Sequence, residues 1–124
     1  MSEKILWIVK RDYADENRFK KYAKKHRAEV VSCTENLVRL ERFLNKGGTL
    51  QQALSFGFFG SEGENVYRIG QTRIVNAKET RLYIYAKITG PEIQLLTIGD
   101  KSTQQDDIKK CKAAARSIEK EKTI

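Results

Sequence analysis

The chain alternates strictly between two kinds of side chain from residue 81 to residue 88, which predicts a β-strand over Arg81–Thr89. One face of this strand carries aliphatic side chains, which are Leu82, Ile84, Ala86 and Ile88. The other face carries cations and aromatic rings, which are Arg81, Tyr83, Tyr85 and Lys87. The aliphatic face suits a hydrophobic core. The other face offers groups that contact phosphates and stack on bases.

Three further segments have the composition of β-strands. Lys4–Lys10 and Asn65–Gly70 are rich in bulky and β-branched side chains. Ile93–Ile98 follows a turn predicted at Gly90-Pro91, so we expect it to form a hairpin with the alternating strand. The segments between these strands are predicted as a glycine-rich connection over residues 55–64 and a polar link over residues 71–80.

A long helix is predicted in the first half of the chain. Apolar residues recur there at intervals of three and four, the spacing of a helix that packs against a neighbour: Val30, Cys33, Leu37, Leu40 and Leu44. We therefore predict a helix over Ala28–Asn45 that ends before Gly47-Gly48. A competing interpretation makes Glu29–Ser32 a strand and begins the helix at Thr34. The spacing continues back to Val30, which favours the longer helix.

Two more amphipathic helices complete the predicted elements, with a short turn capped by Thr49 between them. The first spans about Asp15–His26 and has a cationic outer face. The last is capped by Ser102 or Thr103 and runs to about Ile118. Its first turn is acidic, which the helix dipole favours.

The order of these elements predicts an α+β fold. An N-terminal strand and a helical hairpin pack on a small, largely antiparallel sheet, and a C-terminal helix follows. We expect the helices to lie on one face of the sheet, which leaves the face of Arg81, Tyr83 and Tyr85 open. Residues 1–124 form a single domain in this prediction, and the charged tail, residues 119–124, frays.

The charge balance favours a polyanionic partner. The chain has 24 Lys and Arg residues against 16 Asp and Glu residues, a formal net charge of +8, and its pI is near 9.6. Nucleic acid or an acidic protein fits this balance better than a membrane surface does. Solvated lysine-rich helices produce the same balance without any partner.

The composition disfavours several classes of chemistry. No apolar run approaches the roughly 20 residues that span a bilayer, and we expect no signal peptide, so the protein is predicted to be cytoplasmic and without a membrane partner. Cys33 and Cys111 have no second Cys or His at ligand spacing, so no metal site is expected. His26 is the only histidine. The glycine-rich connection lacks the Gly-Lys-Ser/Thr ending of a phosphate loop, and we expect no small-molecule cofactor.

The open face of the sheet is the main candidate site. Its predicted catalytic residues, which would surround one phosphate, are Arg68, Arg81, Lys101, Tyr83 and Tyr85. Such a group can support metal-independent RNA cleavage, because guanidinium groups stabilise charge on a phosphate that the ribose 2′-hydroxyl attacks. A tyrosine or lysine with a lowered pKa would move the proton. Further contacts to RNA are expected from Lys87, Arg73 and Lys78. The alternative is that this pattern is ordinary for a solvent-facing strand.

Three phenylalanines stand among the glycines of the predicted connection: Phe56, Phe58 and Phe59. We predict that they anchor the connection by packing, with a cover over a partner site as the alternative. Tyr22 and His26 are predicted at the edge of the core rather than as a catalytic pair. Cys33 and Cys111 are predicted to be small buried hydrophobes.

The last half of the chain resembles the RelE/ParE superfamily of toxins, nearest to the branch called addiction-module killer or HigB-like proteins. The resemblance covers about Val66–Ile118, and the upstream helical hairpin by order and length alone. It is carried by Val66–Gly70, by Glu79–Tyr85 and, most specifically, by the Gly-Asp-Lys-Ser-Thr-Gln run of Gly99–Gln104, with Asp107-Ile108-Lys109 after it.

The resemblance implies a small bacterial toxin, held inactive by a cognate antitoxin, that cleaves mRNA in the ribosomal A site. By this resemblance Arg68 corresponds to the family's functional cation in the strand after the helical hairpin. Arg81 corresponds to the family's arginine at the start of the next strand, and Lys101 to its basic residue after the last strand. The chain departs from the family at two places. Gly70 stands where a second cation is often present, and residues 106–108 lack the aromatic or histidine of the most active members.

The leading hypothesis is a toxin of a type II toxin–antitoxin module that inhibits translation by metal-independent, ribosome-dependent mRNA cleavage. Its partners would be mRNA on the ribosome and the antitoxin protein. Because the catalytic set is incomplete, a ParE-like poison of DNA gyrase without nuclease activity is the first alternative. A non-catalytic RNA-binding protein is the second.

Overall fold

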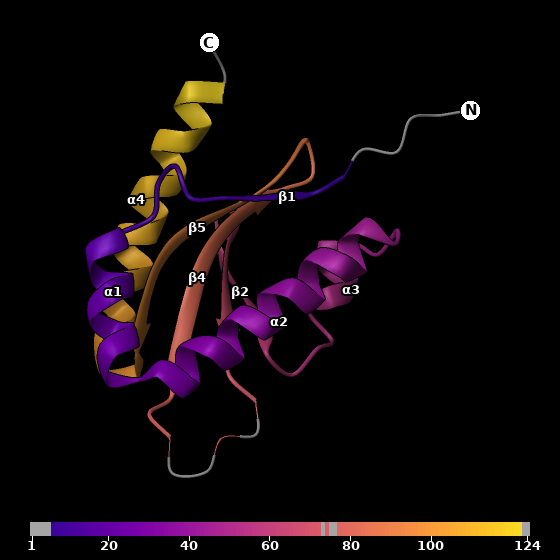
Figure 1. Ribbon diagram of the computed structural model, residues 1–124. Coiled ribbons are helices and arrows are strands. Elements are labelled where there is room, and N and C mark those ends of the chain that lie inside the picture. The colour runs from indigo at the N-terminus through magenta and orange to yellow at the C-terminus, as the bar shows by residue number, and fades with distance from the viewer. Residues whose placement is uncertain (1–5, 73, 75–76, 123–124) are drawn as a thin grey trace.

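The computed structural model describes residues 6–72, 74 and 77–122, and it has the predicted α+β fold with a C-terminal helix (Figure 1). Its strands are β1 (Ile8–Lys10), β2 (Phe59–Gly63), β3 (Val66–Gly70), β4 (Thr80–Lys87) and β5 (Gly90–Asp100). Its helices are α1 (Glu16–Lys25), α2 (Arg27–Asn45), α3 (Leu50–Ala53), the short 3-10 helix η1 (Lys101–Thr103) and α4 (Gln104–Lys122).

The five strands form one sheet in the order β1-β5-β4-β3-β2. β1 runs parallel to β5, and the other neighbouring strands are antiparallel, so the prediction of a largely antiparallel sheet is confirmed. Arg68 of β3 lies opposite Tyr83 of β4, and Gly70 lies opposite Arg81. This register places Arg68 and Arg81 on the same face, as diagonal neighbours.

Strand β2 lies within the segment predicted as a glycine-rich connection, and that prediction is wrong for residues 59–63. β2 is an edge strand that pairs only with β3 among the described strands, so its sequence needs little of the alternation that marks a central strand. The hairpin between β2 and β3 turns through Gly63, Glu64 and Asn65, whose φ angles are +89°, +55° and +64°. Glycine and asparagine adopt such angles at low cost.

Helix α2 confirms the longer of the two interpretations of its segment, and the competing strand at Glu29–Ser32 is wrong. The stripe of Cys33, Leu37, Leu40 and Leu44 is buried along its whole length. The same spacing cannot be buried by a strand, whose side chains alternate with a period of two. α1 is also confirmed, and the side chain of Asp15 caps it by accepting from Arg18 N at 3.2 Å.

The helices cover both faces of the sheet, and the prediction that they lie on one face is wrong. α1, α2 and α3 pack on the face of Leu82, Ile84 and Leu95 (Figure 1). α4 packs on the opposite face, where its residues Cys111, Ala115 and Ile118 contact Val66, Leu96 and the rings of Tyr83 and Tyr85. The apolar stripe of α4 needs a surface to bury it, and the first face is already filled by α2.

Two predicted boundaries differ from the structure around β5. The hairpin between β4 and β5 turns at Ile88 and Thr89, because Lys87 pairs with Gly90, so the turn predicted at Gly90-Pro91 is wrong. Asp100, rather than Ser102 or Thr103, caps the turn that leads into α4, by accepting from Ser102 N at 2.8 Å. The same carboxylate oxygen also accepts from the Ser102 hydroxyl at 2.5 Å.

α4 continues to Lys122, beyond the predicted end of this helix at about Ile118. Glu119 ties this end of the helix to the sheet. Its carboxylate accepts from the hydroxyl of Tyr85 and from Lys87 Nζ, the latter at 2.7 Å. These bonds hold the pKa of Glu119 below its usual range, with the Lys87 bond as the main cause.

Both cysteines are buried, as predicted, and we expect neither to react in the native state. Burial raises the pKa of Cys33 and of Cys111 to about 12 each, so almost no thiolate is present at neutral pH. Titration with a thiol-specific chromogenic disulfide should label no cysteine in the folded protein and two after unfolding in guanidinium chloride. Labelling of the folded protein within minutes would contradict this arrangement.

Candidate functional site

Arg68 and Arg81 line one hollow at the lower end of β3 and β4, with a volume of about 280 Å³. The remaining residues that line it are Gly57, Phe58, Phe59, Gly70, Gln71, Glu79 and Thr80. The two arginines lie together, as the strand pattern predicts. The hollow is polar and contains two guanidinium groups, which is the character of a site for a phosphate or carboxylate.

Glycines create the space in this hollow. A Cβ built at Gly70 would meet only the carbonyl oxygen of Phe58, at 3.8 Å, so a side chain there would occupy the hollow itself. At Gly60 the situation is the reverse, because a Cβ would lie 2.6 Å from the guanidinium of Arg68. Gly60 therefore lets the Arg68 side chain lie flat across β2, beside the space that Gly70 leaves open.

Each arginine is ion-paired to a glutamate. Arg68 Nη1 donates to Glu62, and Arg81 Nη2 donates to Glu79 Oε1 at 3.0 Å. The side chain of Arg81 is 15% exposed, whereas that of Glu79 is 61% exposed. An exposed carboxylate is held weakly and can be displaced by another anion.

The Nε atom of Arg81 is buried and has no hydrogen-bond partner among the described residues. A buried donor without an acceptor is costly, and native proteins rarely contain one. Glu79 contacts only one edge of this guanidinium group, at Nη2. Arg81 therefore has a donor that no described residue uses.

The two tyrosines are not on an open surface, and that expectation is wrong. Tyr83 is 0% exposed and Tyr85 is 1% exposed, because α4 covers them. Burial raises the pKa of both hydroxyls well above the usual range. Neither residue lines the hollow. The catalytic role of Tyr83 and Tyr85 remains a prediction, and the structure places no tyrosine among the groups that line the hollow.

Lys101 is exposed and lines a separate, shallower hollow of about 430 Å³, together with Ala77, Lys78, Glu79 and Ser102. Lys78 Nζ lies 3.8 Å from Asp100 Oδ2. Glu79 borders both hollows. The predicted cluster of three cations is therefore divided, with Arg68 and Arg81 on one side of Glu79 and Lys101 on the other.

The remaining predicted RNA contacts are scattered. Lys87 is paired with Glu119 at the far end of β4, away from the hollow. Arg73 lies outside the described residues. Among the described residues no group of His, Cys, Asp and Glu side chains could hold a metal ion.

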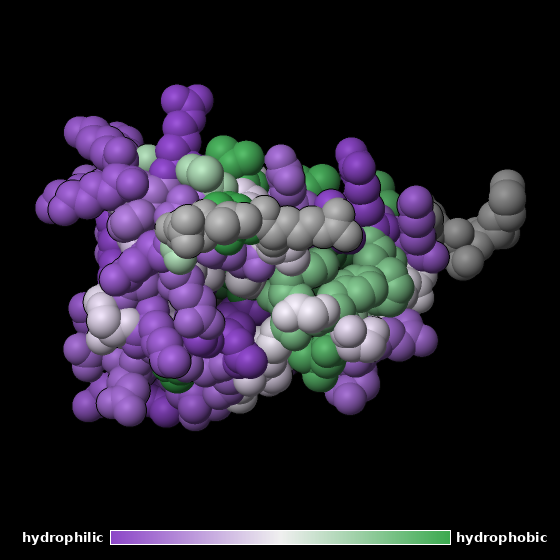
Figure 2. Space-filling model, turned by 90° about the horizontal axis from the view of Figure 1, so that it is seen from below, coloured by the Kyte–Doolittle hydropathy of each residue, from purple (hydrophilic) through white to green (hydrophobic). Residues whose placement is uncertain are grey.

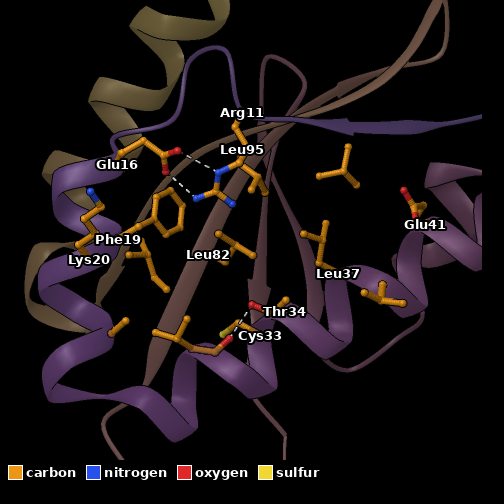
Figure 3. Close-up of a pocket in the computed structure, with 15 residues that line it drawn as sticks. Arg11, Glu16, Phe19, Lys20, Cys33, Thr34, Leu37, Glu41, Leu82 and Leu95 are labelled. Carbon is orange, nitrogen blue, oxygen red and sulfur yellow. Dashed lines mark hydrogen bonds and ion pairs between the residues drawn. The ribbon is translucent and has the colours of Figure 1, made fainter.

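A larger apolar groove of about 620 Å³ lies on the opposite face of the sheet, between α1 and α2 (Figure 3). Leu82 and Leu95 form its floor, and Phe19 and Leu37 project from the two helices that border it. The groove does not follow from the sequence pattern, because its width depends on how far apart α1 and α2 lie. The signal in the sequence was Val38, an apolar residue outside the buried stripe of α2, which is 38% exposed and lines the groove.

Comparison with known proteins does not assign the chain to a family. No family model, no curated protein and no solved structure matches it. In the part of the chain that the structure describes, no helix has both the length and the apolar character needed to cross a membrane.

Proposed function

We propose that the protein is the toxin of a type II toxin–antitoxin module and inhibits translation by metal-independent, ribosome-dependent cleavage of mRNA. The observation that supports this most is the pair Arg68 and Arg81 in one hollow, where Arg81 has an unused buried donor and an exposed, displaceable partner. The RNA phosphate takes the place of the Glu79 carboxylate at Arg81. The net charge of +8 favours the approach of RNA.

The reaction needs charge stabilisation and one proton relay. The ribose 2′-oxygen forms a bond to phosphorus while the bond to the 5′-oxygen breaks, which leaves a 2′,3′-cyclic phosphate and a 5′-hydroxyl. Arg68 and Arg81 donate to the phosphoryl oxygens, where negative charge develops. Glu79 is the carboxylate that lines the hollow, so in this proposal it accepts the 2′ proton once RNA has displaced it from Arg81. Solvent water gives a proton to the departing 5′-oxygen, and the resulting hydroxide is neutralised by the proton that Glu79 releases.

The test is a cell-free translation reaction with the purified protein, followed by mapping of mRNA 5′ ends. We expect new ends only when ribosomes are translating, and these ends should carry a 5′-hydroxyl. Intact mRNA with normal protein synthesis would overturn the proposal, and DNA breaks in a gyrase supercoiling assay would then indicate a gyrase poison.

A non-catalytic RNA-binding protein is the second candidate. The burial of Tyr83 and Tyr85 favours it, because it removes two of the five predicted catalytic side chains from the surface. Salt-dependent RNA binding without new mRNA ends, and without a growth defect on expression, would identify this function.

The cognate antitoxin is the proposed protein partner, and the apolar groove between α1 and α2 is its proposed docking site. A groove with an apolar floor and mainly apolar lining fits an apolar segment of a partner. Val38 lines this groove, whereas Val31, at 48% exposure on the same helix, does not.

We expect Val38→Glu to weaken antitoxin binding by at least about tenfold, because docking would bury the new charge. The matched control Val31→Glu should leave affinity unchanged. Isothermal titration calorimetry with the antitoxin encoded beside the toxin measures both. Equal effects of the two substitutions would place the antitoxin elsewhere.

A further inference from the structure

Phe58 lines the same hollow as Arg68 and Arg81 and is half-buried. Its ring stacks on that of Phe56, with centroids 5.5 Å apart and an interplanar angle of 24°. Phe56 in turn packs edge-on against Phe43 of α2, at 4.9 Å and 74°. A row of three rings therefore holds the side chain of Phe58, a residue that lines the hollow of the two arginines.

The backbone of Phe58 is fixed to the floor of the hollow. Its carbonyl oxygen accepts from the N–H of Gly70 at 2.7 Å, the residue that lies opposite Arg81 on the neighbouring strand. The distance from Phe58 to the guanidinium groups is therefore set by the sheet and not by a free loop. Figure 2 shows the lower face of the molecule, where a hydrophobic group of residues lies directly beside a hydrophilic one.

The size of the hollow limits what can enter it. The volume of the hollow, about 280 Å³, is slightly below the roughly 300–1,000 Å³ of pockets that bind drug-sized molecules. One nucleotide therefore fits, and a base-paired helix does not. Single-stranded RNA is recognised by bases that leave the stack and lie against aromatic rings, with arginines on the backbone. The hollow brings together an aromatic residue, Phe58, and two arginines.

We propose that the hollow is a single-nucleotide site in which the base next to the phosphate on Arg68 and Arg81 stacks against Phe58. The site takes an unpaired nucleotide of a single strand, and Gln71, whose Oε1 already accepts from Thr80 N at 3.0 Å, offers its Nε2 to the edge of the base. This inference rests on the proposed function only in taking RNA as the ligand. It adds Phe58 as a residue that contacts the base, whereas the arginines contact the phosphate of the backbone.

The test measures binding of two fluorescent hexamers by anisotropy. One is a 2′-O-methyl RNA, which cannot be cleaved, and the other has the same backbone without bases. We expect Phe58→Leu to weaken binding of the base-bearing hexamer by about tenfold, in line with the loss of one base–aromatic stack, and to leave the abasic hexamer unaffected. Phe58→Tyr keeps the ring and should bind both hexamers as the wild type does.

Two further variants separate the loss of stacking from other causes of weaker hexamer binding. Gly70→Val fills the hollow and should weaken both hexamers. Gln51→Ala removes an exposed side chain of α3 that does not line the hollow, and should change neither. Circular dichroism and the melting temperature confirm that each variant is folded.

The proposal is overturned if Phe58→Leu affects both hexamers equally, if it affects neither, or if the wild type does not distinguish the two. Because these hexamers cannot be cut and no ribosome is present, the outcome is independent of the proposed function. Base-dependent binding by a protein that leaves mRNA intact would refute the nuclease and support the nucleotide site.

Discussion

Replacement of Asp107 by alanine should lower the free energy of unfolding by about 3 kcal/mol, the lower end of what removal of one partner from a buried ion pair costs. Asp107 is 1% exposed and lies in the first turn of α4. Its carboxylate accepts from Arg18 Nη1 and Nη2, at 2.5 and 3.3 Å, and from the hydroxyl of Thr103 at 2.7 Å. The Arg18 side chain is 26% exposed, so water partly compensates the charge left behind.

This ion pair joins the two helical layers. Arg18 belongs to α1 on one face of the sheet, and Asp107 belongs to α4 on the other. The pair lies over Gly99, where a Cβ would be 2.2 Å from Asp107 Oδ2 and 3.0 Å from Arg18 Nη2. Loss of the carboxylate should therefore loosen α4 from the sheet as well as destabilise the whole domain.

Urea unfolding followed by circular dichroism measures this effect. The control is Asp106→Ala, because Asp106 is exposed in the same turn of α4 and its loss should cost at most about 1 kcal/mol of helix-dipole interaction. The double variant Arg18→Ala/Asp107→Ala should be more stable than the sum of the single effects implies. Equal destabilisation by Asp106→Ala and Asp107→Ala would show that the buried ion pair contributes nothing.

The elements with a strong period were predictable from the sequence, and those that depend on their neighbours were not. The stripe from Cys33 to Leu44 predicted α2, and the alternation from Arg81 to Lys87 predicted β4. β2 was missed because an edge strand is paired on one side alone and carries glycines. One of these, Gly60, lies under the guanidinium group of Arg68, where a Cβ would clash.

The error about the open face has a physical origin. A strand that alternates aliphatic residues with tyrosines does not show whether the aromatic face meets solvent or a helix, since a tyrosine ring is apolar and its hydroxyl needs only one partner. For Tyr85 that partner is Glu119, 34 residues further along the chain. The apolar stripe of α4 was visible in the sequence, and because α1, α2 and α3 already fill the first face of the sheet, this stripe is buried on the second.

The candidate site was predictable in part for the same reasons. The strand register alone brings Arg68 and Arg81 to one face, so this pair followed from the sequence. Their partners Glu62 and Glu79 did not, because one lies on the missed strand and the other precedes β4 in the polar link. The contribution of Phe58 to the hollow depends on the same missed hairpin.

Arg81→Ala should reduce the rate of mRNA cleavage in a translation reaction by at least about 100-fold, the usual cost of removing one donor to a developing oxyanion. Arg81 is the more buried of the two arginines, and it has a donor with no partner among the described residues. Arg81→Lys keeps the charge but loses the second donor edge of the guanidinium group. It should therefore recover only a small part of the rate. Primer extension on a reporter mRNA, over a time course, gives the rate for each variant.

Lys101→Ala is the matched control, because it also removes one cation but from the neighbouring hollow. We expect its cleavage rate to fall by less than about tenfold, as a phosphate contact outside the reacting group would. The cleavage positions should stay the same in this variant. If Lys101→Ala lost as much activity as Arg81→Ala, both cations would act on one phosphate and Glu79 would have to move aside during the reaction. If Arg81→Ala cleaved mRNA at the wild-type rate, the hollow would not be the site of cleavage.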